Sequence, residues 1–356
     1  MVVHRFKSLH NRVMKKGILV GFGFMGGMHA QIYKRLPEAD IVAVVDPDTE
    51  SALAKLKELD MDAVHFETLT DALKSVEADF VDVCLPTFMH VAAAREAIAA
   101  GKAVFCEKPL ATDTAEAETL VSEAEAAGIT FMVGHCIRFW PEYVALRRLI
   151  ESGDAGQLLS LTLQRRSARP GYSKDNWLQD PSKSCGAALD LHIHDTDFVL
   201  HLLGVPTAVT STGVNDFGGV SHIFTQYHYD GGPVILAEGG WNYPANWGFL
   251  MAFQAVFEKG AMEYDSNASP TTRIVIGEGE PTEATLDKAD AGDSELGEGN
   301  VSELGGYYFE LSHFVDCLEN GTKPETSTGR DALASLKTAF AEILSVESGQ
   351  TQSVES

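Results

Sequence analysis

Apolar and polar positions follow two different patterns along the chain, and the change comes near residue 138. Between residues 16 and 135, short runs of β-branched and apolar residues alternate with longer stretches of helical periodicity. Strands separated by crossover helices form parallel sheets, and near-continuous apolar strands are buried on both faces. The pattern predicts a doubly wound parallel sheet, with strands at residues 17–21, 41–46, 63–66, 80–85, 103–106 and 130–134 and helices at residues 24–36, 49–59, 89–100 and 114–127.

Beyond residue 138, longer alternating runs follow one another with few helices between them. Successive strands without crossover helices pair mostly antiparallel, and such a sheet usually exposes one face. We expect strands at residues 158–165, 208–214, 222–229, 234–241, 250–258, 261–264 and 273–276. Helices are expected at residues 142–151, 186–203, 307–318 and 330–347.

The two patterns predict an α/β chain with two domains. We expect a doubly wound domain at residues 16–137 and an α+β domain with an open, mostly antiparallel sheet at residues 138–350. Residues 1–15 are basic and are expected to form an arm without fixed structure. The acidic, glycine-containing stretch at 277–303 lacks the regular spacing of a calcium loop and predicts a solvated loop. An exposed sheet face favours self-association, so we expect a homodimer or homotetramer.

Composition narrows the possible partners. The chain has 27 Lys+Arg against 51 Asp+Glu, a formal net charge of −24, which disfavours binding to nucleic acid or to an anionic membrane surface. No apolar run reaches the roughly 18 residues that a transmembrane helix needs. The five cysteines are widely spaced with no CxxC pair, and the first residues lack the apolar core of a secretory leader. These features predict reduced thiols and a cytoplasmic protein.

The sequence GFGFMG follows the first predicted strand and opens the first predicted helix. Glycines at this spacing allow a tight turn, close approach of the backbone to a pyrophosphate and close helix–strand packing. Asp46 ends the second predicted strand, where a carboxylate binds the ribose 2′-hydroxyl and repels a 2′-phosphate. We therefore expect NAD, in preference to NADP, at Gly21, Phe22, Gly23, Phe24, Met25, Gly26 and Asp46.

Four segments carry a family resemblance. They are GFGFMGGMHA at 21–30, LPTFMHVAAAREAIAAGKAVFCEKPLA at 85–111, GHCIRFWPEY at 134–143 and GAALDLHIHDTDFVLHLLG at 186–204. In this order the chain resembles the glucose-fructose oxidoreductase / inositol dehydrogenase (Gfo/Idh/MocA) family, from about residue 16 to residue 349. The resemblance implies an NAD-binding Rossmann domain at 16–137 and a C-terminal domain with an open antiparallel sheet at 138–350. The substrate is then expected between them, beside the nicotinamide.

Lys108 is expected to be catalytic. It follows a predicted strand at the carboxyl edge of the parallel sheet, where its ammonium can polarise a substrate oxygen. The resemblance implies this role for the EKP lysine, and it places Glu107 beside the cofactor. Pro86 and His90 match the family's strand-Pro-x-x-x-His turn. For His90, a loop on the nicotinamide side and a structural helix start both remain open.

Asp190 and His194 lie four residues apart in a predicted helix and therefore share one face. An imidazole suits proton transfer at neutral pH, and a neighbouring carboxylate orients it. The resemblance implies that His194 is the general base and that Asp190 is its partner or a ligand of a substrate hydroxyl, with Asp197 supporting them from behind. His192 is only two residues from His194, which separates the rings, so no metal site is expected.

Three further residues are expected at the substrate. Arg138 matches the family's arginine and is expected to hold a hydroxyl or carboxylate, whereas His135 in the same segment has no assigned role. Tyr172 and Trp177 offer aromatic faces to a sugar or cyclitol ring, although loop aromatics also serve packing.

The combined hypothesis is an NAD-dependent oxidoreductase that moves hydride between nicotinamide and a secondary alcohol of a sugar or cyclitol. The alternative is a redox-assisted glycosidase that keeps its NAD without net consumption. A non-catalytic dinucleotide-binding sensor is disfavoured, because the chain retains Lys108 and the pair of Asp190 and His194.

Overall fold

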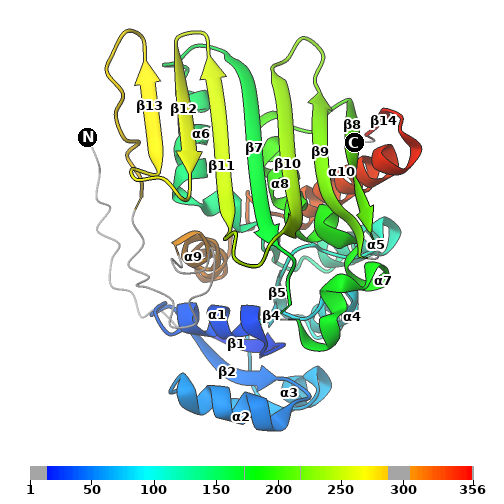
Figure 1. Cartoon of the computed structure of the whole chain (residues 1–356). Helices are drawn as coiled ribbons and strands as arrows, with labels where there is room; N and C mark the ends of the chain where they lie inside the picture. The colour runs from blue at the N-terminus through cyan, green and yellow to red at the C-terminus, as the bar shows by residue number, and fades with distance from the viewer. Residues whose placement is uncertain (1–13, 172, 217, 288–304, 355–356) are drawn as a thin grey trace.

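The computed structural model of the chain describes residues 14–171, 173–216, 218–287 and 305–354, which form two sheets with helices packed around them (Figure 1). The first sheet has six parallel strands in the order β3-β2-β1-β4-β5-β6. Nearly all of the arm expected at residues 1–15 lies outside the described residues. The six strands are β1 (Lys15–Val20), β2 (Ala39–Val45), β3 (Val64–Phe66), β4 (Phe80–Val83), β5 (Ala103–Cys106) and β6 (Phe131–Val133).

The predicted parallel sheet is confirmed, and local signals explain its helices. Asp48 accepts a hydrogen bond from the Ser51 N–H, and Asp113 accepts one from Glu116, so each begins its helix as an N-cap. One short helix was not predicted, because its seven residues hold too few turns for a clear period. The helices are α1 (Phe24–Tyr33), α2 (Thr49–Glu58), α3 (Leu69–Ser75), α4 (His90–Ala99) and α5 (Thr114–Ala126).

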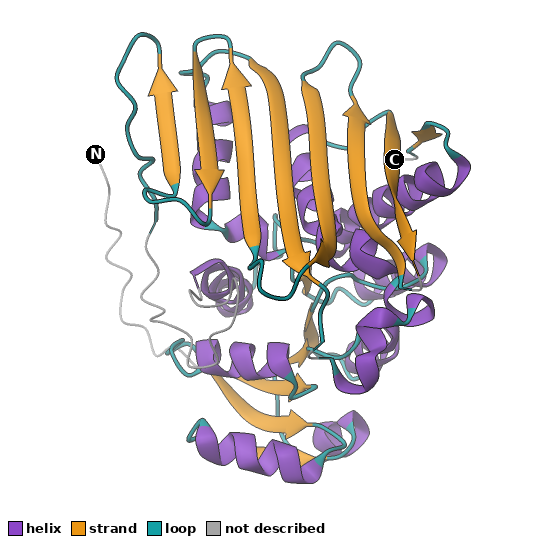
Figure 2. Ribbon diagram, viewed as in Figure 1, coloured by secondary structure: helices purple, strands orange, loops and turns teal. Residues whose placement is uncertain are grey.

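The second sheet has eight strands in the order β13-β12-β11-β7-β10-β9-β8-β14 and is mostly antiparallel, as expected. One pair, β7 with β10, is parallel. Figure 2 shows the sheet from its open face, with the helices behind it. The strands are β7 (Leu158–Ala168), β8 (Ala208–Asp216), β9 (Gly219–His228), β10 (Val234–Tyr243), β11 (Leu250–Phe257), β12 (Gly260–Asp265), β13 (Thr272–Ile276) and β14 (Gln352–Ser353).

Helices between and after these strands place the site residues. The long ones are α6 (Pro141–Ser152), α8 (Ile193–Leu203), α9 (Gly305–Asn320) and α10 (Gly329–Ser348). Four short turns complete the path: η1 (Thr87–Met89), η2 (Cys136–Phe139), η3 (Lys174–Gln179) and α7 (Pro181–Ser184). The helix expected at 186–203 begins with a π-helical turn, η4 (Ala188–His192), before α8. The acidic stretch expected as a loop lies outside the described residues beyond residue 287.

One continuous core joins the two sheets. Phe314 of α9 packs edge-to-face on Phe80 of β4 and on Phe105 of β5, with ring centroids 5.6 Å apart in both pairs. Helix α10 contacts α5 beside the first sheet and both β8 and α8 beside the second. The C-terminal helices therefore belong to both halves of the molecule, and the boundary expected at residue 137 stays a prediction. In the described part of the chain, no helix is both long and apolar enough to cross a membrane.

A buried polar cluster lies between α8, α10 and β9. The Thr196 hydroxyl is 3.0 Å from Glu342 Oε1 and 3.0 Å from the Tyr227 hydroxyl, and His192 Nε2 is 3.5 Å from Glu342 Oε2. Burial raises the pKa of Glu342 to about 8, and burial lowers the pKa of His192 to about 3. At neutral pH the folded protein therefore keeps Glu342 protonated and His192 neutral.

Glu342→Gln is expected to flatten the pH dependence of stability between about pH 6.5 and pH 8. In that range the folded state holds one proton more at Glu342 than the unfolded state, so this group lowers the free energy of unfolding by about 1.4 kcal/mol per pH unit as pH rises. Below about pH 6.5 the buried, neutral His192 contributes the opposite slope, and the two contributions cancel. The variant should lose that slope in urea titrations at several pH values. Glu347→Gln, an exposed change on the same helix, is the control. Equal slopes in the wild type and Glu342→Gln would contradict a buried, protonated Glu342.

Candidate active site

Close backbone contacts in the loop between β1 and α1 require glycine at two of its positions. Gly21 has a φ of +87°, and a Cβ on it would lie 2.7 Å from the Cys84 carbonyl oxygen. A Cβ on Gly26 would lie 2.0 Å from the Gly21 oxygen, so the helix and the loop meet without room for a side chain. Around Gly23, by contrast, a Cβ would meet no atom within 4 Å. This open space lies at the N-terminus of α1, where helix N–H groups favour a phosphate.

Two charged side chains hold this loop. Asp46, which follows β2, accepts a hydrogen bond from the Phe22 N–H at 2.9 Å and one from Asp48 at 2.9 Å. Lys55 of α2 donates to the carbonyl oxygens of Phe22 at 2.6 Å and Gly23 at 2.8 Å. Each Asp46 oxygen keeps a second lone pair that can accept a ribose hydroxyl. The glycines, the helix N-terminus and Asp46 therefore fit a dinucleotide, while Lys55 is a loop contact that sequence reasoning missed.

Lys108 and Asp190 meet although 82 residues separate them. The Lys108 ammonium donates to the backbone oxygen of Asp190 at 2.7 Å and lies 3.4 Å from its Oδ1. Lys108 comes from the turn after β5, at the carboxyl edge of the parallel sheet, and Asp190 comes from the π-helical turn η4. The side chains are 14% and 20% exposed, so both still face solvent. A small molecule reaching this edge would touch them together.

His194 lies at the start of α8, buried beside this pair. Its Nδ1 is buried and without a hydrogen-bond partner. Burial, followed by the positive charges of Lys108 and Arg165, lowers the pKa of His194 well below its ordinary value. The ring is therefore neutral at pH 7 and able to accept a proton.

Asp190 was expected to pair with His194, but its carboxylate lies next to Lys108 instead. The Asp190 carboxylate faces Lys108, and it makes no hydrogen bond with His194 among the described contacts. The physical reason is the π-helical turn, whose hydrogen bonds span five residues instead of four, so side chains four residues apart no longer stack. The charge with the largest effect on the pKa of His194 is that of Lys108, which lowers it.

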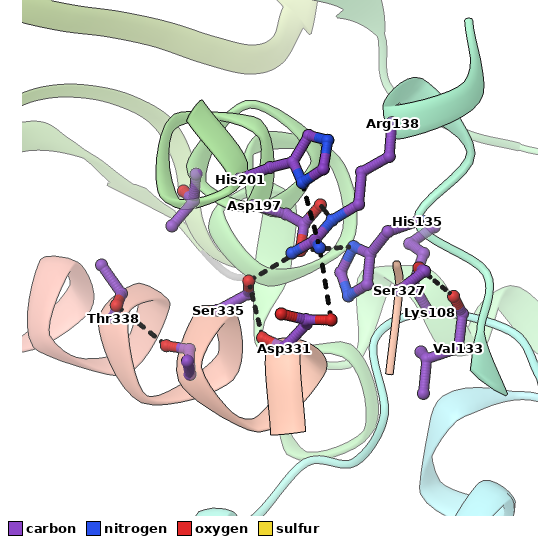
Figure 3. A network of polar contacts seen from close by, with 12 residues as sticks. Lys108, Val133, His135, Arg138, Asp197, His201, Ser327, Asp331, Ser335 and Thr338 are labelled. Atoms are coloured by element: carbon purple, nitrogen blue, oxygen red, sulfur yellow. Dashed lines mark hydrogen bonds and ion pairs between the residues drawn. The ribbon is translucent and has the colours of Figure 1, made fainter. Parts of the chain in front are cut away.

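Arg138 is held by the protein itself. Its Nε is 2.7 Å from Asp197 Oδ2 and its Nη2 is 2.8 Å from Oδ1, a bidentate pair buried behind the site (Figure 3). Ser335 of α10 donates to Asp197 Oδ1 at 2.7 Å, and Asp331 lies 3.4 Å from Arg138 Nη1. With its donors so engaged, Arg138 is badly placed for the expected substrate contact. It joins η2, α8 and α10 instead.

His135 lies in the same network. Its Nδ1 is 3.5 Å from Asp197 Oδ1 without a hydrogen bond between them, and the ring is buried (Figure 3). Burial lowers the pKa of His135, against the opposing charge of Asp197. The Asp197 carboxylate is thus shared between Arg138 and Ser335, with His135 close by, and the support expected from it for Asp190 and His194 stays a prediction.

Two residues expected at the cofactor bind other parts of the chain. His90 is buried, with Nδ1 2.9 Å from the Pro109 oxygen and Nε2 2.7 Å from the Leu85 oxygen. It therefore clamps the turn after β4, which contains Pro86, to the turn after β5, and this favours the structural alternative. The Glu107 carboxylate also turns inward, 3.1 Å from His29 Nε2. A direct contact of either side chain with a cofactor is not favoured by these positions.

The aromatic residues expected at the substrate differ in position. Trp177 of η3 packs edge-to-face on Phe88 of η1, with ring centroids 6.2 Å apart, so it joins the two halves of the molecule near the site. Tyr172 lies outside the described residues. His192 packs against Gly239 of β10 instead of facing Lys108.

Sequence reasoning also missed His29. It lies in α1 within GFGFMGGMHA, and its partner Asp82 is a carboxylate inside the apolar strand β4. A charged residue in a fully buried strand is the one signal that would have indicated a buried partner.

Comparison with known proteins decides the family. Residues 15–135 match the description "Oxidoreductase family, NAD-binding Rossmann fold", and residues 143–263 match "GFO/IDH/MocA C-terminal domain". The chain belongs to the GFO/IDH/MocA oxidoreductase family.

Individual members of the GFO/IDH/MocA family differ in their sequence identity to the chain and in how much of it they cover. Inositol 2-dehydrogenase 4 of Saccharopolyspora erythraea is 31% identical, over 75% of this chain and 78% of its own. The 2,7-anhydro-N-acetylneuraminate hydratase of Escherichia coli (strain K12) is 30% identical over 64% of this chain, and the match spans only 62% of the hydratase. The structure of GenD2 from gentamicin A biosynthesis, in complex with NAD, is 25% identical with a TM-score of 0.81, over 98% of both chains.

Asp46→Ser is expected to relax discrimination against NADP. Removing the carboxylate removes its repulsion of a 2′-phosphate, so the ratio of NADP to NAD affinity should rise by roughly tenfold or more. Fluorescence titration of the purified protein with each cofactor measures the ratio. Asp48→Ser deletes a neighbouring carboxylate that caps α2 and serves as the control. If both variants keep the wild-type ratio, Asp46 does not face the ribose.

Proposed function

We propose that this GFO/IDH/MocA protein is an NAD-dependent oxidoreductase acting on a secondary alcohol of a sugar or cyclitol. The observation that carries the proposal is the contact of the Lys108 ammonium with Asp190, in the turn that leads into His194. The charge of Lys108, at the carboxyl edge of the parallel sheet, also helps to keep the His194 imidazole neutral, which supports a joint role for the two groups. The glycine loop and Asp46 lie at the same edge.

The chemistry follows from these groups. NAD, when bound, supplies the acceptor for a hydride from the alcohol carbon. Lys108 donates a hydrogen bond to the hydroxyl oxygen and stabilises the negative charge that grows there. His194 accepts the hydroxyl proton. The alcohol thus loses one proton and one hydride and becomes a ketone, while Asp190 holds Lys108 and accepts from a neighbouring hydroxyl.

The substrate class rests on chemistry and on relatives. Lys108, Asp190 and His194 suit a molecule that carries several hydroxyl groups, because the ammonium donates hydrogen bonds while the carboxylate and the neutral imidazole can accept them. Family members named as inositol 2-dehydrogenase and D-apiose dehydrogenase act on such molecules by their names. A screen of inositols, pyranoses and sugar acids with NAD, followed by NADH absorbance, tests the proposal. No NADH with any polyol would count against it.

A second candidate function is redox-neutral cleavage of an anhydro or glycosidic linkage, with NAD oxidising the sugar transiently and then reducing it again. The family member named 2,7-anhydro-N-acetylneuraminate hydratase, 30% identical to this chain, favours it, because its name describes no net oxidation. Release of a free sugar without accumulation of NADH would identify this activity. Accumulation of NADH in step with ketone would identify the dehydrogenase.

His194→Ala is expected to lower turnover by ~10²-fold or more while NAD affinity stays nearly unchanged. Because the pKa of His194 is lowered, its neutral form persists in acid. The acid limb of kcat/KM for alcohol oxidation should therefore lie below pH 6.5. Steady-state kinetics across pH with the substrate from the screen measure both. His313→Ala, a change on α9 at a half-buried ring, should stay within about twofold of wild type. Full turnover in His194→Ala would remove the assignment.

We also propose that two copies pair through the open face of the second sheet. Alternation along its strands puts five exposed apolar side chains on this face: Val214, Phe224, Val234, Leu236 and Val256. Exposed apolar side chains gathered on a sheet face are typical of an interface. A second copy would cover them.

Phe224→Glu combined with Leu236→Glu is expected to convert the oligomer to a monomer, because it buries two carboxylates in the interface. Light scattering after size exclusion measures the mass. Val64→Glu, an exposed valine on β3, should leave the mass unchanged. A wild-type protein that is already monomeric would refute the pairing.

The five cysteines are free, and four of them are buried. Unpaired thiols are typical of proteins in a reducing compartment. We therefore propose that the protein works in the cytoplasm, which fractionation of cells expressing it would test.

A further inference from the structure

A buried array of charged side chains lies directly beneath the turn that carries Lys108. It consists of His29 from α1, Asp82 from β4 and Glu107 from the end of β5, with Glu310 from α9 beside them. His29, Asp82 and Glu310 are fully buried, and Glu107 is 5% exposed. The proposed reaction with NAD uses neither His29 nor Asp82, so these two buried residues have another role.

The His29 ring lies between two carboxylates. Its Nδ1 is 2.8 Å from Asp82 Oδ2, and its Nε2 is 3.1 Å from Glu107 Oε1. Where both carboxylates are ionised they only accept hydrogen bonds, so both ring nitrogens donate and the ring is an imidazolium. Burial opposes that charge, but the charge and the hydrogen bond of Asp82 outweigh it and raise the pKa of His29 well above its ordinary value. A metal ion would need a free lone pair on the same ring, which this pairing uses up.

Glu107 links this imidazolium to the catalytic turn. Its Oε1 contacts His29, and its Oε2 accepts the backbone N–H of Lys108 at 3.1 Å. A Cβ on Gly134 would lie 3.0 Å from Glu107 Oε1, so the carboxylate fits a space kept open by that glycine. His90 holds the far side of the same turn through the Pro109 oxygen. The backbone at Lys108 is therefore fixed from both ends.

The charge on His29 favours the ionised form of Glu107, the residue that precedes Lys108. Burial alone would raise the pKa of Glu107, but His29 lowers it, first by hydrogen bond and then by charge, with a smaller contribution from Lys108. Glu107 is therefore an ionised carboxylate next to the Lys108 ammonium in sequence. Without a cation at position 29, the nearest cation for this buried carboxylate would be Lys108, because an unpaired buried charge is costly.

We propose that His29 is a positioning residue for the catalytic turn. Its imidazolium holds the Glu107 carboxylate below the sheet edge, which leaves the Lys108 ammonium free to contact Asp190 and the substrate oxygen. This inference rests on the proposed role of Lys108. It assigns a function to a residue that touches neither substrate nor cofactor.

A crystal structure of His29→Gln tests the geometry without any turnover. Glutamine has one donor group and no charge, so Lys108 Nζ should leave the Asp190 oxygen, 2.7 Å away in the wild type, and approach Glu107. Lys108 remaining on the Asp190 oxygen would overturn the proposal. The wild-type protein supplies a second test that requires no variant to fold. Nitrogen NMR of the assigned His29 ring should show two N–H groups at pH 7.5, and a single N–H would overturn it.

Kinetics separate positioning from a general loss of structure. With a substrate found by the screen, His29→Gln should lower kcat by about tenfold or more while the affinity for NAD stays within about twofold. Glu107→Gln removes the competing carboxylate, so the double variant should be no slower than the slower single variant. Additive losses would overturn the proposal.

Glu310→Gln is the matched control. It changes a carboxyl to an amide within the same buried array, and both Glu310 oxygens lack partners. Burial raises the pKa of Glu310 well above its ordinary value, so the amide replaces a neutral group and kcat should stay within about twofold of wild type. A loss as large as that of His29→Gln would show that any change in this array damages the enzyme, and would overturn the specific role of His29. If Lys108→Met retains full turnover, the proposed function itself fails, whereas the crystallographic and NMR tests still judge His29.

Discussion

The contact between the Lys108 ammonium and the backbone oxygen of Asp190 holds the two halves of the candidate site together. It joins the turn after the fifth parallel strand to the π-helical turn before α8. A partly buried ammonium needs acceptors, and here the protein supplies a carbonyl and a carboxylate from the other half of the molecule. Any rearrangement that separates the two turns therefore leaves both groups without a partner and removes the cation from His194.

Buried ion pairs surround this contact on the side away from solvent. Arg138 with Asp197 and Arg165 with Asp195 are both bidentate and both buried. Such pairs contribute little net stability compared with apolar packing, because each charge loses its hydration. Their effect is geometric, since a broken pair would leave a buried charge. They fix the orientation of α8, and Arg165 also helps to keep His194 neutral.

The secondary structure was predictable because its signals are local. Alternation and helical periodicity located every strand of the two sheets except the two-residue β14, and the glycine spacing located the turn between β1 and α1. The parallel pairing of β7 with β10 was not predictable, because it depends on which strands become neighbours in the folded sheet. The family resemblance brought Lys108, Asp190 and His194 to one site, and their long sequence separation means that no local pattern would have done so.

The sequence by itself determined the elements, the glycine turn and the residue types available for chemistry, since each depends on neighbours within a few positions. Only the tertiary structure decided the partners. Arg138 pairs with Asp197, 59 residues away, and Glu107 pairs with His29, 78 residues away. Asp190 contacts Lys108 from a π-helical turn, in which side chains four residues apart no longer stack. Hydrogen bonds and ion pairs form between groups that packing brings together, and packing is a property of the whole chain.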